Sequence, residues 1–260
     1  MTLHNEALKG TGPIPIDQGI YETSSTQKAT LGTRVAFADG RVFRYGRCGA
    51  TKLRNGLFVT SAAPIATNCL NIPVGAAAVT GTYDVLIATH EPVTTAAEGY
   101  LMINDAQGEG VMYKIKTCAA DTGTSTNWTS LGLYDPIVLG LVTASEATIV
   151  FNPYDVLTLV SATTDSVVGV PPIQVPIGYY FWVQTWGLSN VLANGTAPAG
   201  CLLVAAASGA ATIATTGLNA LVAPQSTGAS ITSLAVPVGY QYGTVGVSGE
   251  FKPVWLQIAP

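Results

Sequence analysis

The stretch from Gly178 to Gly187, Gly-Tyr-Tyr-Phe-Trp-Val-Gln-Thr-Trp-Gly, constrains the fold of this chain most strongly. Aromatic and β-branched residues favour the pleated, half-buried surface of a β-strand, and a glycine flanks the run at each end. Alternation sends Tyr180, Trp182 and Trp186 to one face, while Phe181 lies on the other, so both faces carry aromatic bulk. The stretch therefore predicts a central strand whose aromatic side chains serve as core or interface residues.

The composition favours strands over helices along the rest of the chain. Only 10% of the 260 residues are charged, and 28 glycines and 15 prolines punctuate the sequence. Amphipathic helices need charged outer faces, so the chain can form few of them, whereas short strands joined by turns suit this composition. We therefore expect an all-β protein of antiparallel barrel or sandwich units, with an extended N-terminal arm and little helix.

Turn signals recur about every eight to twelve residues, as in a β-sandwich or barrel. The clearest hairpins turn at Asp39-Gly40 and at residues 104–109, and further separate strands are expected at 137–142 and 191–192. We expect three parts. These are an extended basic arm and hairpin at 1–54, a barrel or sandwich domain at 55–170, and a second, Gly/Ala-rich β unit at 171–260 that can pack with the first as one body.

Charge is distributed unevenly along the chain. Residues 1–54 carry eight of the eleven basic side chains and have a net charge of +4, whereas residues 55–260 have a net charge of −8. We expect the basic segment to bind an acidic surface on its own chain, on a neighbouring copy or on another protein. The residues expected to make this contact are Arg34, Arg41, Arg44, Arg47, Lys52 and Arg54. Their interleaving with apolar strand residues, without a nucleic-acid-binding motif, argues against nucleic acid.

No residue pattern indicates a catalytic or metal site. The two histidines, His4 and His90, are far apart in sequence, and Asn104–Glu109 lacks the Asp/Asn alternation of a calcium loop. The four cysteines are spaced singly, which is typical of buried thiols rather than of a zinc site or a disulfide framework. We expect no enzyme activity, no catalytic residue, no metal or other cofactor, and no small-molecule substrate.

The first residues, Met-Thr-Leu-His-Asn-Glu, lack the basic and then apolar pattern of a signal peptide. The apolar stretch at 201–224 is interrupted by serine, glycine, asparagine and threonine, unlike a membrane-spanning helix. We expect a protein that is made in the cytoplasm and has no membrane partner.

Several motifs together resemble structural proteins of tailed bacteriophages. They are Leu31-Gly-Thr-Arg34 with Asp39-Gly-Arg-Val-Phe-Arg-Tyr-Gly-Arg47, Glu98–Asp105 with Gly108–Lys116, Leu133-Tyr-Asp-Pro136, and the Tyr-Phe-Trp-x-Gln-Thr-x-Gly run of the aromatic stretch. The C-terminal Gly-rich part, with its closing Val-Trp-Leu-x-Ile run, is similar in style to small capsid-decoration barrels. The resemblance covers residues 31–200 best.

The resemblance implies a non-enzymatic virion protein, a decoration (cement) protein that binds and stabilises the outside of the phage head. Its implied partners are the major capsid protein and further copies of itself, expected as a trimer, after synthesis in the bacterial cytoplasm. One alternative is a tail or fibre module that binds host-surface glycans through Trp128 and Trp186. An enzyme of another type would require a pocket that places His90 beside an Asp or Cys.

Overall fold

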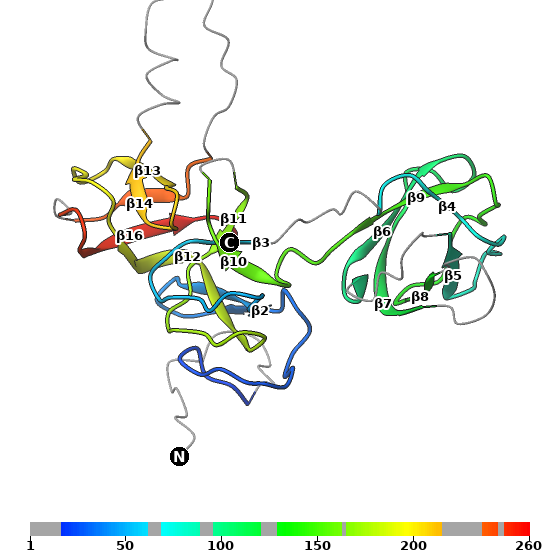
Figure 1. Ribbon diagram of the computed structural model, residues 1–260, viewed down its shortest axis with the longest axis horizontal. Helices are drawn as coiled ribbons and strands as arrows, with labels where there is room; N and C mark the ends of the chain where they lie inside the picture. Colours follow the sequence, from blue (N-terminus) through cyan, green and yellow to red (C-terminus); the bar gives the residue numbers. More distant parts are fainter. Residues whose placement is uncertain are drawn as a thin grey trace, which may run out of the picture. The chain divides into compact units, whose positions relative to one another are not determined.

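The computed structural model describes residues 17–61, 69–88, 96–120, 129–162, 165–214, 236–243 and 247–260. The sixteen elements named within these ranges are all strands, and they pair antiparallel in three sheets (Figure 1). The chain divides into two compact units. The discontinuous unit comprises Met1–Ala62 and Tyr154–Pro260, and the inserted unit comprises Ala63–Pro153. The expected all-β fold with little helix is confirmed.

The discontinuous unit is built on a seven-stranded sheet with the order β1-β2-β12-β16-β15-β13-β14. Its strands are β1 (Arg34–Ala36), β2 (Val42–Arg47), β12 (Tyr180–Leu192), β13 (Leu202–Ala205), β14 (Ala211–Ile213), β15 (Gly239–Gln241) and β16 (Phe251–Gln257). The predicted hairpin at Asp39-Gly40 is confirmed, because β1 and β2 pair across it. The last strand, β16, lies inside the sheet between β12 and β15.

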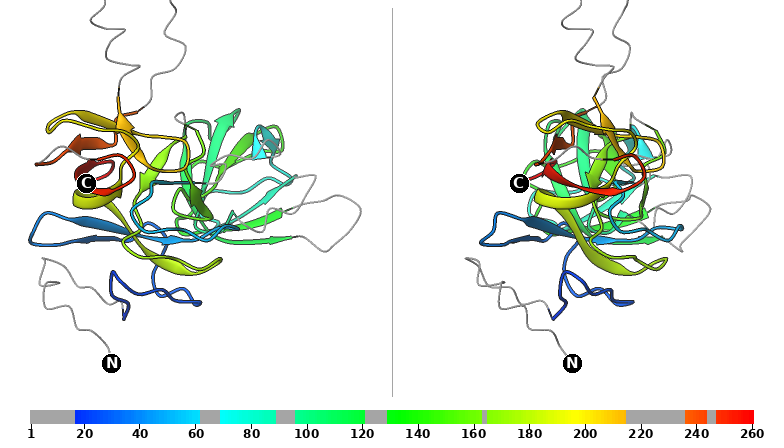
Figure 2. Two further views of the ribbon diagram at one scale, coloured as in Figure 1. Left: turned by 60° about the vertical axis from the view of Figure 1, so that its left-hand side comes forward. Right: turned by 90° about the vertical axis from the view of Figure 1, so that its left-hand side faces the viewer.

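Strand β12 is the centre of this sheet, as the aromatic stretch predicts. Residues 180–186 pair with β2 across a bulge between Gln184 and Trp186, and residues 186–192 pair with β16. The long strand is the yellow-green ribbon beside the blue β2 in Figure 2. Residues 191–192, expected as a separate strand, are the end of β12. Gly187 does not end the strand. It has a φ of 83° and would place a Cβ 2.9 Å from the carbonyl oxygen of Gly40, so glycine here permits close approach of the hairpin turn.

A second, three-stranded sheet of the discontinuous unit has the order β10-β3-β11. Its strands are β3 (Val59–Ser61), β10 (Leu157–Leu159) and β11 (Val167–Gly169). The expected domain boundaries after residues 54 and 170 do not match the observed units. Strand β3 comes before the inserted unit in sequence and pairs with two strands that follow it, so one body is assembled from both ends of the chain.

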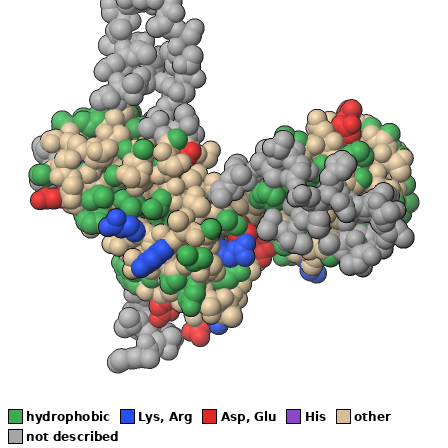
Figure 3. Space-filling model, in the orientation of Figure 1, with side chains coloured by type: hydrophobic (Ala, Val, Ile, Leu, Met, Phe, Trp, Pro, Cys, Tyr) green, Lys and Arg blue, Asp and Glu red, His purple; other side chains and the backbone are tan. Residues whose placement is uncertain are grey.

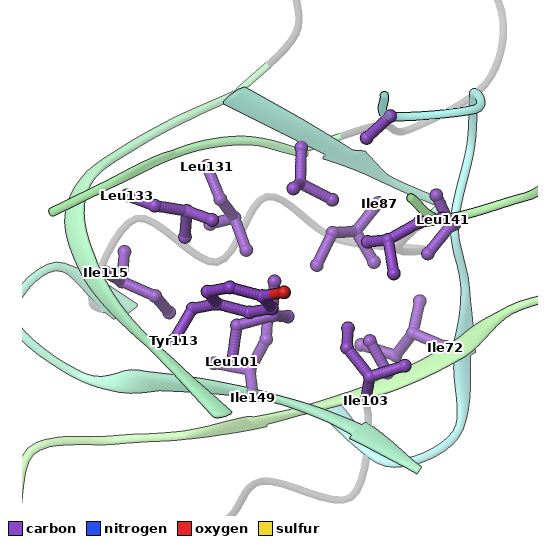
Figure 4. Close-up of a cluster of buried hydrophobic side chains, with 14 of the residues drawn as sticks. Ile72, Ile87, Leu101, Ile103, Tyr113, Ile115, Leu131, Leu133, Leu141 and Ile149 are labelled. Atoms are coloured by element: carbon purple, nitrogen blue, oxygen red, sulfur yellow. The ribbon is translucent and has the colours of Figure 1, made fainter. Parts of the chain in front are cut away.

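The inserted unit contains a six-stranded sheet with the order β4-β9-β6-β7-β8-β5. Its strands are β4 (Ile72–Pro73), β5 (Asp84–Ile87), β6 (Tyr100–Asp105), β7 (Met112–Ala120), β8 (Thr129–Leu133) and β9 (Glu146–Val150). A bridge between Val74 and Ile87 joins the two edges, so the sheet is a nearly closed barrel around an apolar core (Figure 4). The hairpin turning at 104–109 is confirmed by the β6–β7 pairing. Residues 137–142 form no strand, because only Leu141 makes a bridge, to Ala78.

Candidate partner-binding surface

The structure separates the six basic residues into an internal and an exposed group. Arg47 belongs to the internal group, because its guanidinium binds Asp155 in a bidentate pair, with Nε–Oδ1 2.6 Å and Nη2–Oδ2 2.9 Å. Burial opposes the charge of Arg47, but the hydrogen bonds to Asp155 prevail and raise its pKa. The Asp155 side chain is itself buried, so this charge stabilises the fold and is not offered to a partner.

Arg41 and Arg44 also have internal partners. Arg41 donates from Nε to Asp39 Oδ2 at 2.6 Å, and its guanidinium lies 5.2 Å from the ring centre of Phe37. Arg44 donates to the backbone oxygens of Gly32 and Pro260, at 3.3 and 3.1 Å. Arg41 is therefore engaged within its own hairpin, whereas Arg44 joins the hairpin to Gly32 and to the C-terminal residue.

The exposed group consists of Arg34, Lys52 and Arg54. Lys52 and Arg54 flank Leu53, which is fully buried and exchanges backbone hydrogen bonds of 3.0 Å with Val175. Because neighbouring side chains of an extended segment alternate, this anchor turns both cations outward. On the face drawn in Figure 3, charged side chains are few among apolar and neutral ones. Of the six predicted contact residues, these three are therefore the cations available to an acidic partner.

The three aromatic residues singled out in β12 lie at different depths. Trp182 lies in the core, where the residue is 1% exposed, and its indole N–H donates a hydrogen bond to the Gln18 carbonyl oxygen at 2.9 Å. Tyr180 is half-buried and stacks on Tyr45, with ring centres 6.0 Å apart. Trp186 is half-buried at the bulge. Trp182 therefore joins the N-terminal segment to the central strand, whereas Tyr180 packs on β2.

An apolar row on the outer face of the sheet was not anticipated from sequence. Leu188, Trp255, Tyr240 and Leu202 are directly opposite one another on β12, β16, β15 and β13, so their side chains share one face. Leu188 is 42% exposed and Leu202 36%, and Tyr242 packs at 6.0 Å beside Trp255. Side chains alternate between the two faces along each short strand, as expected. Only the pairing register between the strands shows that these four outward side chains lie side by side. We call these four residues the outer row.

A pocket of about 420 Å³ adjoins one end of the outer row. It is lined by Tyr21, Arg41, Asn55, Gly56, Pro171, Pro172, Gln184, Leu188, Ser189, Asn190 and Pro253. Its polar groups include a side-chain amide that is already engaged, since Gln184 Nε2 donates to the carbonyl oxygens of Trp186 and Leu188 at 3.1 and 2.9 Å. The volume falls in the range of small-ligand sites, and the lining includes three prolines and three amide side chains as well as Arg41.

Lys252 is a buried cation in β16. Its residue is 2% exposed, and its Nζ atom has no hydrogen-bond partner within the described part of the chain. Burial lowers its pKa because the charged ammonium loses its hydration. It lies opposite Val191, which is fully buried. Nothing in the sequence distinguishes this lysine from an exposed strand residue.

Within the described ranges, no group of three or more His, Cys, Asp or Glu side chains could hold a metal ion. No described helix is long and apolar enough to cross a membrane. None of the four cysteines forms a disulfide; Cys48 and Cys69 are buried, and Cys118 and Cys201 are half-buried. His4, His90 and Trp128 lie outside the described residues.

Comparison with known proteins adds no relative, since no family model, no curated protein and no solved structure matches this chain.

Proposed function

We propose that this protein is a non-enzymatic structural protein of a tailed-phage virion that decorates the exterior of the capsid and stabilises it. The sequence motifs that resemble phage structural proteins support the proposal. The observation that carries it is the exposed group of Arg34, Lys52 and Arg54 on an otherwise charge-poor surface. Such cations suit an acidic lattice, where many weak contacts gain strength through multivalency.

The proposed partners are the major capsid protein, which the exposed group contacts, and further copies of this chain, arranged as a trimer. Cations in the rim of an interface mainly set the association rate and its salt dependence. Arg41, Arg44 and Arg47 then contribute to capsid binding only indirectly, because their charges are engaged inside the discontinuous unit.

The test is the combined substitution Arg34→Glu, Lys52→Glu and Arg54→Glu, followed by co-sedimentation with phage heads that lack the protein. We expect loading to fall at least tenfold, with the loss greatest at low salt, while the circular dichroism spectrum stays unchanged. The control is Lys116→Glu on the exposed surface of the inserted unit, which reverses a charge elsewhere. Loading that survives the triple substitution contradicts the proposed contact.

The position in the particle is tested separately by labelling a chain terminus and imaging purified virions. Label on the head surface supports decoration, whereas label on the tail contradicts it.

The second candidate function is glycan binding by a tail or fibre module. The half-buried aromatic rings of Tyr240 and Trp255 favour it, because sugars stack on such rings. Loss of glycan binding in Trp186→Ala or Trp255→Ala, with assembly unchanged, would support that candidate.

A further inference from the structure

The outer row is an apolar strip that crosses four neighbouring strands of the seven-stranded sheet, β12, β16, β15 and β13. Neighbouring strands lie about 4.8 Å apart, so the strip is about 14 Å long. At one end Leu188 is 42% exposed, although Tyr21 lines the adjoining pocket with it. At the other end Leu202 is 36% exposed. Both ends are therefore accessible within the described part of the chain.

Two further aromatic residues widen this strip. Tyr242 is 46% exposed and packs beside Trp255, with ring centres 6.0 Å apart. Phe251 is 48% exposed, and it lies on the same side of β16 as Trp255 because burial alternates along that strand. We call the outer row together with Tyr242 and Phe251 the aromatic face.

The aromatic face carries no charge. None of its six residues is charged, and Lys252, the charged residue of β16, is buried. Arg41 lines the pocket beside Leu188, but its guanidinium is paired with Asp39 at 2.6 Å. The cores of protein–protein interfaces are depleted in charged residues and enriched in Trp, Tyr and Phe. The composition of the aromatic face is therefore that of an interface core.

The lack of charge makes the aromatic face suitable for contact with itself. In a two-fold pair the same patch lies on both sides, so any charged residue in it is brought toward its own copy. Another exposed aromatic pair shows the difference. Tyr83 and Tyr134 of the inserted unit are neighbours, since Leu133 N–H donates to the Tyr83 oxygen at 2.7 Å, but the exposed carboxylates of Asp84 and Asp135 follow them in sequence. A two-fold contact there would bring carboxylates together, whereas the aromatic face meets no such repulsion.

The size of the aromatic face also suits one side of a protein–protein interface. Four of its six residues are between 36% and 48% exposed. With about 150–250 Å² for each complete side chain, these four expose roughly 300 Å², and the half-buried Tyr240 and Trp255 raise the sum to roughly 400 Å². One side of a standard interface covers about 800 Å², of which a little more than half is non-polar. The aromatic face therefore supplies the apolar area that one copy must contribute.

We propose that the aromatic face binds the aromatic face of a second copy of this chain in a two-fold contact. Trp255 and Tyr240 occupy the middle of the outer row, between Leu188 and Leu202, and a central Trp or Tyr is the usual place of an interface hot spot. The inference goes beyond the proposed function because the contact needs no capsid. A trimer uses a different, three-fold contact, so this pairing is additional to it.

The test is sedimentation velocity of the purified full chain from about 1 μM to about 1 mM, a range that covers weak and moderate dissociation constants. Leu188→Asp with Leu202→Asp places like charges on both sides of the contact, and we expect at least tenfold weaker self-association. The matched control is Val138→Asp with Leu139→Asp, at residues of the inserted unit that are 57% and 52% exposed. We expect the control to associate within about threefold of the unchanged chain.

A mixing experiment tests the two-fold symmetry. Leu188→Lys with Leu202→Lys should weaken self-association as the aspartate variant does. An equimolar mixture of the two variants should associate at least tenfold more tightly than either alone, because a two-fold contact then sets opposite charges against each other. If both variants associate weakly and the mixture does as well, the aromatic face does not meet itself and the inference is overturned. Circular dichroism of each variant shows whether it is folded.

Hydroxyl-radical labelling of Tyr242 and Phe251 gives a readout in the unchanged chain, without any substitution. We expect labelling of both side chains to fall as the concentration rises, while labelling of Tyr83 on the inserted unit stays constant. Weak labelling at every concentration overturns the inference, because the chain would then cover its own aromatic face. A chain that is monomeric up to the highest concentration also overturns it, and leaves the aromatic face to the glycan candidate.

Discussion

Replacing Lys252 by methionine should stabilise the discontinuous unit. The lysine is 2% exposed, and its Nζ atom has no hydrogen-bond partner in the described ranges, so the charged form of this side chain is not compensated there. A buried polar group without a partner costs about 1–3 kcal/mol, and a charged one more. Methionine keeps the unbranched stem beside Val191 and removes that cost, so we expect a gain of about 1–3 kcal/mol in the free energy of unfolding at pH 7.

The gain should depend on pH in a defined direction. Because the pKa of Lys252 is lower in the folded state, the cost is fully present below the folded-state pKa. It disappears as the pH rises through that value toward the unfolded-state pKa. The difference between Lys252→Met and the unchanged protein should therefore shrink as the pH is raised from 7 to 10.

The assay is urea unfolding followed by tryptophan fluorescence, which mainly reports on the discontinuous unit because Trp182, Trp186 and Trp255 belong to it. The control is Lys116→Met at an exposed position, which should change stability by less than about 0.5 kcal/mol at either pH. A Lys252→Met protein no more stable than the original at pH 7 refutes the reasoning. A gain of the same size at pH 7 and pH 10 refutes the assignment to the ammonium charge.

Three further substitutions test individual contacts. Asp155→Ala should destabilise the discontinuous unit by about 1.5–3 kcal/mol in urea unfolding, because it leaves the half-buried guanidinium of Arg47 without its carboxylate. Gly187→Ala should lower stability by about 1–3 kcal/mol in the same assay, since alanine is strained at a φ of 83° and its methyl group would meet the hairpin backbone. Asp165 has its pKa lowered by the backbone N–H of Ser161, so its contribution to stability is present at neutral pH and lost as the pH falls through its folded-state pKa. Acid titration of unfolding should show this loss in the original protein and not in Asp165→Asn.

The fold class could be predicted because composition and local pattern decide it. The scarcity of charge excludes many amphipathic helices, and the aromatic run around Trp182 can be buried on both faces only in a central strand. The turn at Asp39-Gly40 is a local signal, and it formed the expected hairpin. These predictions needed no knowledge of which distant segments meet.

The domain division and the ion pairs could not be predicted, because they depend on contacts between distant segments. Strand β3 is too short to show that its partners follow the inserted unit, and Arg47 has no neighbour in sequence that identifies Asp155 as its partner. The six cations therefore looked alike in sequence, although only Arg34, Lys52 and Arg54 are exposed. The same limit applies to the outer row, whose members come from four strands.

The pairing of β3 with β10 has a consequence for the order of folding. Ser61 lies opposite Leu157, so the ladder that closes this part of the discontinuous unit must bring together residues separated by the whole inserted unit. Joining such distant residues has an entropic cost that grows with the length of loose chain between them. If the barrel of the inserted unit forms first, that intervening chain becomes a compact body and the cost falls. Folding of the inserted unit would then be an early step for a body to which it contributes none of the described strands.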